Sequence, residues 1–365
     1  MRSHAIAMLC VGGLSMAWWL AMPATDGPLA AEPRETAVPE IVSPFGDRLR
    51  PMNRILDQSA EGWDVWGCAP IYGPGGEVHV FFARWRQGPS RADVTWARTG
   101  QIAHAVAERP EGPYQFKRVV LQGRGAGHWD GSGVINPQMY AIDGKYVLLY
   151  TGAHDGQLQG QQIGMATSDS LDGPWRMVSD ERPLLAVSKE RSDFDSYLVN
   201  NPALVKTPEG KYFLYYKGRD VFNDPKGKRK IGLAIADRLE GPYRKHEGNP
   251  ILDMSRVGKD FEDPYVWIEA GRFCMLMHDM GVFEHGAGLY LESFDGIHWS
   301  KPVPGYPSTL RLFGVRERLE TPILLLRDGR PDYLFTNRAG RGDQRVLSGF
   351  VFKVLPRDPS RRQGR

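Results

Sequence analysis

The feature that most constrains this 365-residue chain is a short pattern that returns five times. Each copy has a proline, an apolar run, a glycine turn and a second apolar run, which is typical of two antiparallel strands joined by a hairpin. The copies follow one another at intervals of roughly 60 to 70 residues, as in proteins built from repeated small sheets. The five copies begin at Ala69-Pro70, Asn136-Pro137, Asn201-Pro202, Asp263-Pro264 and Thr321-Pro322.

A second motif recurs between these copies and adds outer strands to each unit. It ends in a turn that reads Gly-Pro-aromatic at Tyr114, Trp175 and Tyr243, and returns more loosely at Trp299. Stacking such sheets around an axis buries both of their faces, and closing the ring removes the exposed edges. The sequence therefore predicts an all-β fold, a five-bladed β-propeller, with a β-sandwich that carries accidental repeats as the alternative.

The two ends of the repeat region predict how the ring closes. Residues 53–57 read Asn-Arg-Ile-Leu-Asp, and residues 249–253, an outer strand before the fourth copy, read Asn-Pro-Ile-Leu-Asp. The N-terminal segment is thus expected to supply the missing outer strand of the last blade, whose own strands end at 346–355. Main-chain hydrogen bonds between the two ends would lock the ring.

The N-terminal residues differ from the rest of the chain. Arg2 precedes an apolar run over 5–22, and small residues follow at Ala24 and Ala30-Ala31, which is the pattern of a secretory signal peptide. An uncleaved N-terminal anchor is the alternative. The predicted organisation is a signal peptide at 1–31, a linker at 32–52, the propeller at 53–356 and a basic tail at 357–365. The expected location is secreted or periplasmic.

The composition of the chain limits the classes of partner that it is expected to bind. The chain is 41% hydrophobic, enough for a large core, and its net charge of +3 is too small to indicate a nucleic-acid partner. No second stretch is long and apolar enough to span a bilayer, so no membrane contact is expected once the signal is removed.

Cys68 and Cys274 fall in blades that are not neighbours and are expected to be buried free thiols. The oligomeric state stays open.

The chemistry-bearing residues collect at two places in the repeat. In a propeller, the start of the innermost strand and the end of the next strand lie at one rim of the central channel. Polar residues at these places are therefore expected to converge on one pocket. The acids at strand starts are Asp64, Asp130, Asp195, Glu262, Asp263 and Glu320, and the polar residues at second-strand ends are Arg84, Lys217, His278, Asp279 and Asn337.

Several carboxylates in one pocket raise one another's pKa and lower the stability of the fold, so such a cluster indicates a function. Hydrolysis of a glycosidic bond needs one carboxyl group that gives a proton and another that stays ionised. Asp64, Asp130 and Asp195 recur at similar places, so local strand capping is an equal alternative for each. Asp263 and Glu320 break the repeat, and this departure favours a special role.

A sugar ligand would also need aromatic faces and hydrogen-bonding groups. His128 and Trp129 lie beside Asp130, outside the regular strand pattern, and are candidates for the pocket wall. The predicted substrate-binding residues are Asp64, Arg84, His128, Trp129, Asn136, Asp195, Asn201, Lys217, Glu262 and His278. No Cys-x-x-Cys or His-Glu-x-x-His spacing occurs, so no zinc site is predicted.

At Asp263-Pro264 and Glu320-Thr-Pro322 the chain resembles the five-bladed propeller glycoside hydrolases of family 43 and their relatives of family 117. The resemblance covers about 53–355. It implies that Glu320 is the general acid, that Asp263 orients this acid and tunes its pKa, and that an aspartate base activates water with inversion. Where that family has its base, this chain has Asn136-Pro137.

Asp130 is the nearest replacement for that base, and Asp64 is the reserve. The resemblance requires no cofactor, although it allows a structural Ca²⁺ in the channel, for which the sequence shows no ligand motif. The expected function is a secreted glycoside hydrolase with a carbohydrate substrate.

Two other functions stay open. Glu262-Asp263-Pro264 is also similar to the mannoside phosphorylases, in which case Arg84, Lys217 and His278 would hold phosphate. The third possibility is a propeller that binds carbohydrate without catalysis.

Overall fold

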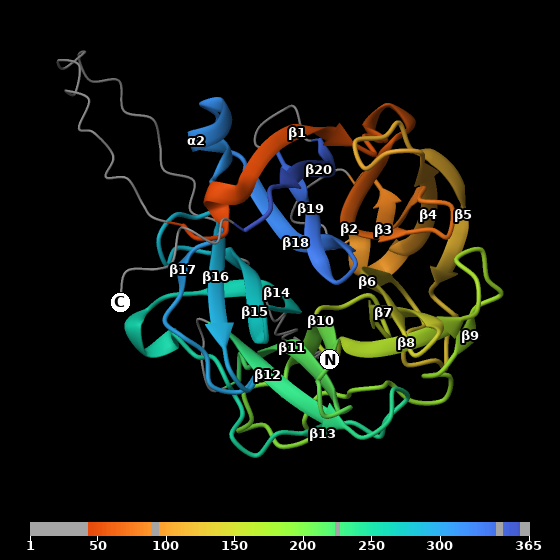
Figure 1. Cartoon of the computed structure of the whole chain (residues 1–365). Helices are drawn as coiled ribbons and strands as arrows, with labels where there is room; N and C mark the ends of the chain where they lie inside the picture. The colour runs from red at the N-terminus through yellow and green to blue at the C-terminus, as the bar shows by residue number, and fades with distance from the viewer. Residues whose placement is uncertain (1–42, 89–94, 223–226, 341–345, 358–365) are drawn as a thin grey trace, which may run out of the picture.

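The computed structural model describes residues 43–88, 95–222, 227–340 and 346–357. In these residues, five four-stranded antiparallel sheets surround one axis, which confirms the five-bladed β-propeller (Figure 1). The predicted signal peptide, the linker before Ser43 and the tail after Arg357 lie outside the described residues. No helix in the described ranges is long and apolar enough to cross a membrane.

The first four blades follow the chain, each from its innermost to its outermost strand. Blade 1 contains β2 (Trp63–Tyr72), β3 (Val78–Arg86), β4 (Gln101–Ala107) and β5 (Gln115–Gln122). Blade 2 contains β6 (Val134–Ile142), β7 (Lys145–Gly152), β8 (Gln162–Ser168) and β9 (Arg176–Met177). Blade 3 contains β10 (Leu198–Lys206), β11 (Tyr212–Arg219), β12 (Arg229–Ala236) and β13 (Arg244–Lys245). Blade 4 contains β14 (Phe261–Glu269), β15 (Arg272–Asp279), β16 (Gly288–Ser293) and β17 (Val303–Pro304).

Blade 5 joins the two ends of the chain. Its strands are β18 (Arg318–Arg327), β19 (Arg330–Ala339), β20 (Leu347–Val354) and the N-terminal β1 (Leu49–Ile55). Strand β1 pairs antiparallel with β20, from Leu49 opposite Val354 to Ile55 opposite Gly349, so the predicted closure is confirmed. Short helices lie between strands: η1 (Gly46–Arg48), η2 (Ser59–Glu61), α1 (Thr95–Thr99), η3 (Ser255–Val257) and α2 (Thr309–Phe313).

The folded part begins earlier than the sequence predicted. Strand β1 starts at Leu49 instead of Asn53. Phe45 is buried and stacks on Tyr290 of blade 4, with ring centroids 5.8 Å apart. Residues 43–52 therefore belong to the propeller and not to a linker, because this aromatic contact buries them against another blade.

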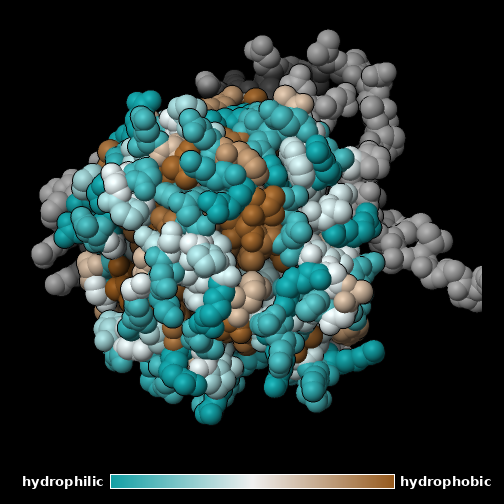
Figure 2. Space-filling view, turned by 90° about the vertical axis from the view of Figure 1, so that its right-hand side faces the viewer, coloured by the Kyte–Doolittle hydropathy of each residue, from teal (hydrophilic) through white to brown (hydrophobic). Residues whose placement is uncertain are grey.

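The inner strands are apolar because each blade is covered on both faces by its neighbours. Phe213 of blade 3, for example, stacks on Phe273 of blade 4 with ring centroids 6.1 Å apart. The outer strands meet solvent: the side of the molecule formed by blades 1 and 2 is mostly hydrophilic, with an apolar area near its middle (Figure 2). Cys68 and Cys274 are buried free thiols, as expected.

Every innermost strand carries a bulge at the same level of the axis. The strand pairing shifts register there, for example between Glu262 and Tyr265 in β14 and between Glu320 and Ile323 in β18. One residue in each bulge adopts a left-handed backbone conformation, which favours Gly and tolerates Asn and Asp. These residues are Gly67 (φ 61°), Asn136 (φ 50°), Asn201 (φ 49°), Asp263 (φ 60°) and Thr321 (φ 50°).

The bulges correct the alignment of the first repeat. In β2 the register shifts between Trp66 and Ala69, so Gly67-Cys68 is the equivalent of Asn136-Pro137. The proline at Pro70 lies further along the strand and does not mark the repeat. The residue that corresponds to Asp263 in blade 1 is therefore Gly67, and the one that corresponds to Glu320 is Trp66.

Hydrogen bonds join these bulges around the axis. Asn136 Nδ2 donates to Asn201 Oδ1 at 3.1 Å, and Asn201 Nδ2 donates to Asp263 Oδ1. The Thr321 amide donates to Asp263 Oδ2 at 3.1 Å, and its hydroxyl donates to Asn337 Oδ1 at 2.7 Å. The Gly67 amide also donates to Asn337 Oδ1, at 2.6 Å. This axial chain of hydrogen bonds runs from blade 2 through blades 3, 4 and 5 to blade 1.

Gly67→Ala tests how tightly the axis is packed. A Cβ at Gly67 would lie 3.1 Å from Pro137 Cδ in blade 2, whereas one at Gly258, which has a similar φ of 71°, would meet nothing within 4 Å. Both alanines carry the left-handed strain of about 1 kcal/mol. We expect Gly67→Ala to lower the free energy of unfolding by roughly 1 kcal/mol more than Gly258→Ala because of the added overpacking. Equal urea midpoints for the two variants would contradict this packing.

Candidate active site

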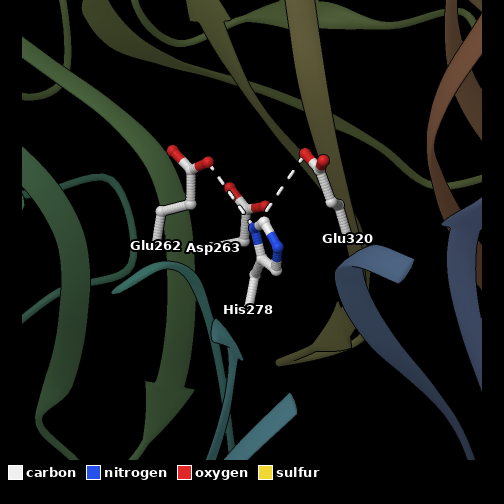
Figure 3. A group of neighbouring side chains, drawn as sticks. All are labelled: Glu262, Asp263, His278 and Glu320. Atoms are coloured by element: carbon white, nitrogen blue, oxygen red, sulfur yellow. Dashed lines mark ion pairs between the residues drawn. The ribbon is translucent and has the colours of Figure 1, made fainter. Parts of the chain in front are cut away.

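Four ionisable side chains from two blades meet beside the axis (Figure 3). Glu262 and Asp263 lie on β14, His278 on β15 and Glu320 on β18. One ligand atom of each lies within 4.8 Å of one ligand atom of every other, and Asp263, His278 and Glu320 are buried. We call these four residues the carboxylate–histidine group.

The bulge explains how two consecutive acids reach one site. Successive side chains of a regular strand point to opposite faces, which would send Glu262 and Asp263 apart. The left-handed backbone of Asp263, with φ 60°, breaks this alternation. Glu262 lies directly opposite His278 across the strand pair, and Glu320 holds the equivalent position in blade 5, opposite Asn337.

Glu262 is held in its ionised form. Its Oε2 lies 2.7 Å from Lys217 Nζ and 3.0 Å from Arg229 Nε. Burial would raise the pKa of Glu262, but the charges of Arg229 and Lys217 outweigh burial and place it well below its usual range. Glu262 is also the least buried of the four residues.

The pKa of Asp263 is shifted in the opposite direction. Burial raises the pKa of Asp263 to about 7, and the negative charge of Glu262 adds to the rise. This happens although both carboxyl oxygens accept a hydrogen bond, one from Asn201 and one from the Thr321 amide. The pKa values of the two neighbouring acids therefore lie apart, because Lys217 and Arg229 form direct ion pairs with Glu262 and lower its pKa more than any cation lowers that of Asp263.

His278 lies between Glu262 and Glu320 (Figure 3). Its Nδ1 is 3.6 Å from Glu262 Oε1 and 4.0 Å from Glu320 Oε2. Burial would lower the pKa of His278, but the charges of Glu320 and Glu262 outweigh it and raise the pKa. Neither ring nitrogen has a hydrogen-bond partner in the described part of the chain. Glu320 Oε1 forms an ion pair with Arg318 Nε at 2.8 Å.

The donor atoms of this group suit a divalent cation. Three carboxylates provide the oxygen ligands that Ca²⁺ prefers, and His278 lies between two of them. Glu262, Asp263, His278 and Glu320 are therefore the residues that could hold the Ca²⁺ that the resemblance allows in the channel.

The structure does not bring Asp130 into this group. Its Oδ1 accepts a hydrogen bond from Arg124 Nε at 2.6 Å, and its Oδ2 accepts one from the Tyr150 hydroxyl at 2.8 Å. The side chain packs over Gly152, at the end of the second strand of blade 2. Asp130 thus fixes a loop on the blade, with both oxygens hydrogen-bonded, and is not a member of the carboxylate–histidine group.

Asp195 repeats this arrangement in blade 3. Its Oδ2 accepts a hydrogen bond from Tyr216 at 2.9 Å and pairs with Lys245 Nζ at 2.6 Å, and its side chain packs over Gly218. The capping alternative therefore describes Asp130 and Asp195. Asp64 is buried on β2 and accepts a 3.4 Å hydrogen bond from Gln87.

Three other predicted residues also lie away from the group. Trp129 stacks on Tyr150 and donates to the Ser179 carbonyl, and the carbonyl of exposed His128 accepts from His154. Arg84 is stacked between two aromatic rings on blade 1.

Four of the predicted substrate-binding residues do reach the axis, directly or through the axial chain: Lys217, His278, Asn201 and Asn136. Because Lys217 is paired with Glu262 and Arg84 lies elsewhere, the three cations do not form the phosphate cluster of the phosphorylase alternative.

Sequence reasoning missed two cations of the site, Arg229 and Arg318. Arg229 begins the third strand of blade 3, a place that the repeat does not mark, and it also pairs with Asp260 at 2.7 Å. Arg318 lies two positions before Glu320 on β18. A basic residue so close to the predicted acid on the same strand was the one available signal.

The fold and the site define the chain as a five-bladed β-propeller with an acidic, histidine-containing site at its axis. No family model matches the chain. A structure of similar fold is a family 117 glycoside hydrolase produced by the marine bacterium Zobellia galactanivorans, with a TM-score of 0.66 and 18% identity over 86% of this chain and 91% of that chain.

A second similar structure is a family 43 β-xylosidase/α-arabinofuranosidase from a compost microbial metagenome, in complex with xylotriose. Its TM-score is 0.56, with 16% identity over 84% of this chain and 94% of that chain. In sequence, the chain is 27% identical over 169 residues to an extracellular endo-α-(1→5)-L-arabinanase of Bacillus subtilis. That match covers 44% of this chain and 33% of the arabinanase. The resemblance to the propellers of families 43 and 117 is thus confirmed at the level of the fold.

The raised pKa of Asp263 predicts a pH dependence of stability. Between about pH 4 and 7 the folded protein keeps a proton that the unfolded chain has released, so this carboxyl group lowers stability as the pH rises. We expect Asp263→Asn to remove this part of the slope in urea unfolding at pH 4.5, 5.5 and 7.

Asp332→Asn is the matched control with the opposite sign. Burial would raise the pKa of Asp332, but hydrogen bonds from Lys353, Tyr72 and Arg327 outweigh it and lower the pKa. Its contribution is present above the unfolded pKa and is lost as the pH falls, so this variant should lose most stability at pH 7. An unchanged wild-type slope in Asp263→Asn would contradict the prediction.

Proposed function

We propose that the protein is a glycoside hydrolase whose active site is the carboxylate–histidine group. The observation that carries the proposal is the contrast between Glu262 and Asp263, adjacent buried acids whose pKa values are shifted in opposite directions. Glu262 thus supplies the ionised carboxylate that glycosidic hydrolysis needs, and Asp263, which keeps a proton to about pH 7, lies beside the proposed proton donor Glu320. A purely structural ring would not need this charged cluster at its axis.

Glu320 is assigned as the general acid that protonates the leaving oxygen. It is buried in β18, and Arg318 and His278 hold its carboxyl group in place. Asp263 orients this region through the axial chain and stays close enough to tune the proton affinity of Glu320.

Glu262 is assigned as the ionised carboxylate that activates water. Lys217 and Arg229 pair with its Oε2, and His278 Nδ1 lies 3.6 Å from its Oε1. Asp130, the base first expected, has both oxygens occupied by Arg124 and Tyr150. With Glu262 as the base, the proposed outcome is inversion, as the resemblance to the propeller glycoside hydrolases implies.

The proposed substrate is a plant or algal poly- or oligosaccharide, and the proposed location is secreted or periplasmic. The similar proteins support this, because one is an extracellular arabinanase and another was solved with xylotriose. Linear arabinan, xylan and agarose are the first polysaccharides to test.

Glu320→Gln is expected to lower the rate of hydrolysis by roughly 10²- to 10⁴-fold while leaving the urea midpoint close to that of the wild type, because the amide cannot give a proton. Glu317→Gln is the control: Glu317 lies on the same approach to β18 but pairs with Arg338 and not with the group. Reducing-end release from the three polysaccharides measures both variants. Near-normal hydrolysis by Glu320→Gln would remove this residue from the mechanism.

The stereochemical outcome tests the role of Glu262. Proton NMR of the first product should show the anomeric configuration opposite to that of the substrate. Added azide should restore activity to Glu262→Ala and form a glycosyl azide, because azide is a nucleophile that needs no base to activate it. A first product with the configuration of the substrate would contradict the assignment of Glu262 as the base.

A further inference from the structure

An open groove of about 870 Å³ lies at the seam where the last blade meets the first. Strand β1, the outermost strand of blade 5, forms one wall, and the turn before β5 forms the other. Residues that line it include Met52, Asn53, Gln58, Glu111 and Phe116. Because these residues belong to outer strands and turns, the seam groove is separate from the site on the innermost strands.

The seam groove contains a braced aromatic ring. Phe116 is 45% exposed, and the guanidinium carbon of Arg84 lies 4.3 Å from its ring centroid. The same guanidinium lies 4.3 Å from the ring centroid of Trp63, and Arg86 covers Trp63 at 4.1 Å. This alternating stack fixes the Phe116 ring before any ligand arrives. A fixed, exposed ring is suited to stack on the apolar face of a sugar.

Hydrogen-bonding groups surround this ring. The amide side chains of Asn53 and Gln58 line the groove and provide hydrogen-bonding groups for a hydroxyl group. Asn53 Nδ2 donates to the Glu111 carbonyl at 2.9 Å and ties the two walls together across the seam. A polar groove with one aromatic platform matches a ligand rich in hydroxyl groups.

The seam groove is equipped for binding and not for hydrolysis. Its Asp57 accepts hydrogen bonds from the amide and hydroxyl of Ser59 at 3.1 and 2.6 Å. Burial would raise the pKa of Asp57, but these hydrogen bonds outweigh it and lower the pKa, so this acid has no proton to give at neutral pH. The lining holds three acids, Asp57, Glu61 and Glu111, and two arginines, Arg54 and Arg109, so it does not favour an acidic chain.

We propose that the seam groove is a second carbohydrate-binding site, which holds a neutral polysaccharide while the axial site cleaves it. The proposal rests on the proposed function for its choice of ligand. The ligand lies against Phe116 through a sugar face and bonds to the side chains around it through hydroxyl groups. The groove thus adds affinity for polymer without touching the reacting bond.

The test measures binding apart from hydrolysis. Glu320→Gln is run in native gels that contain linear arabinan, xylan or agarose, alone and combined with Phe116→Ala. We expect at least one polysaccharide to retard Glu320→Gln, and Phe116→Ala to weaken this retardation about fivefold or more. Phe294→Ala is the matched control, because Phe294 is 76% exposed and stacks on Arg272 at 3.9 Å but lines no part of the groove.

Hydrolysis separates the two proposals. With Glu320 intact, Phe116→Ala should raise the KM for the polysaccharide with kcat unchanged, and it should cleave a short oligosaccharide at the wild-type rate, which also shows that it is folded. Equal retardation of the Phe116 and Phe294 variants, or no retardation of the parent by any of the three polysaccharides, would overturn the seam site. Full activity of Glu320→Gln would overturn the catalytic assignment alone.

Discussion

The axial chain of hydrogen bonds is the interaction on which the rest of the structure depends. The innermost strands of neighbouring blades pack against one another near the axis. Left-handed residues in the five bulges turn polar groups toward the next blade, and Asp263 accepts from blade 3 on one side and from blade 5 on the other. The acid that anchors the ring is therefore also a member of the site.

Burial and local charge then divide neighbouring acids by role. Glu262 and Asp263 are adjacent in the chain and meet the same low-polarity environment, which by itself would favour the neutral form of both. Lys217 and Arg229 form ion pairs with Glu262, so this acid stays charged while Asp263 keeps a proton to about pH 7. Cations supplied by blade 3 thus set the chemistry of blade 4.

The internal repeat determined which site residues could be predicted from the sequence. Glu320 and Asp263 were found because they depart from it, and both lie at the axis. Asp130 was misplaced because a repeated aspartate can cap a loop as readily as line a channel, and only Arg124 and Tyr150 decide between the two. The proline at Pro70 misled the alignment of blade 1, since the bulge there is formed at Gly67.

The sequence by itself determined the five blades, the strand pairs and the closure by the N-terminal strand. These follow from apolar periodicity and turn residues, which act over a few positions along the chain. Only the tertiary structure decided which acids share a site, which cations neutralise them, and that a groove opens beside Phe116 at the seam. Such contacts join residues from different blades, and the side chains that meet there leave no periodic trace along a single strand.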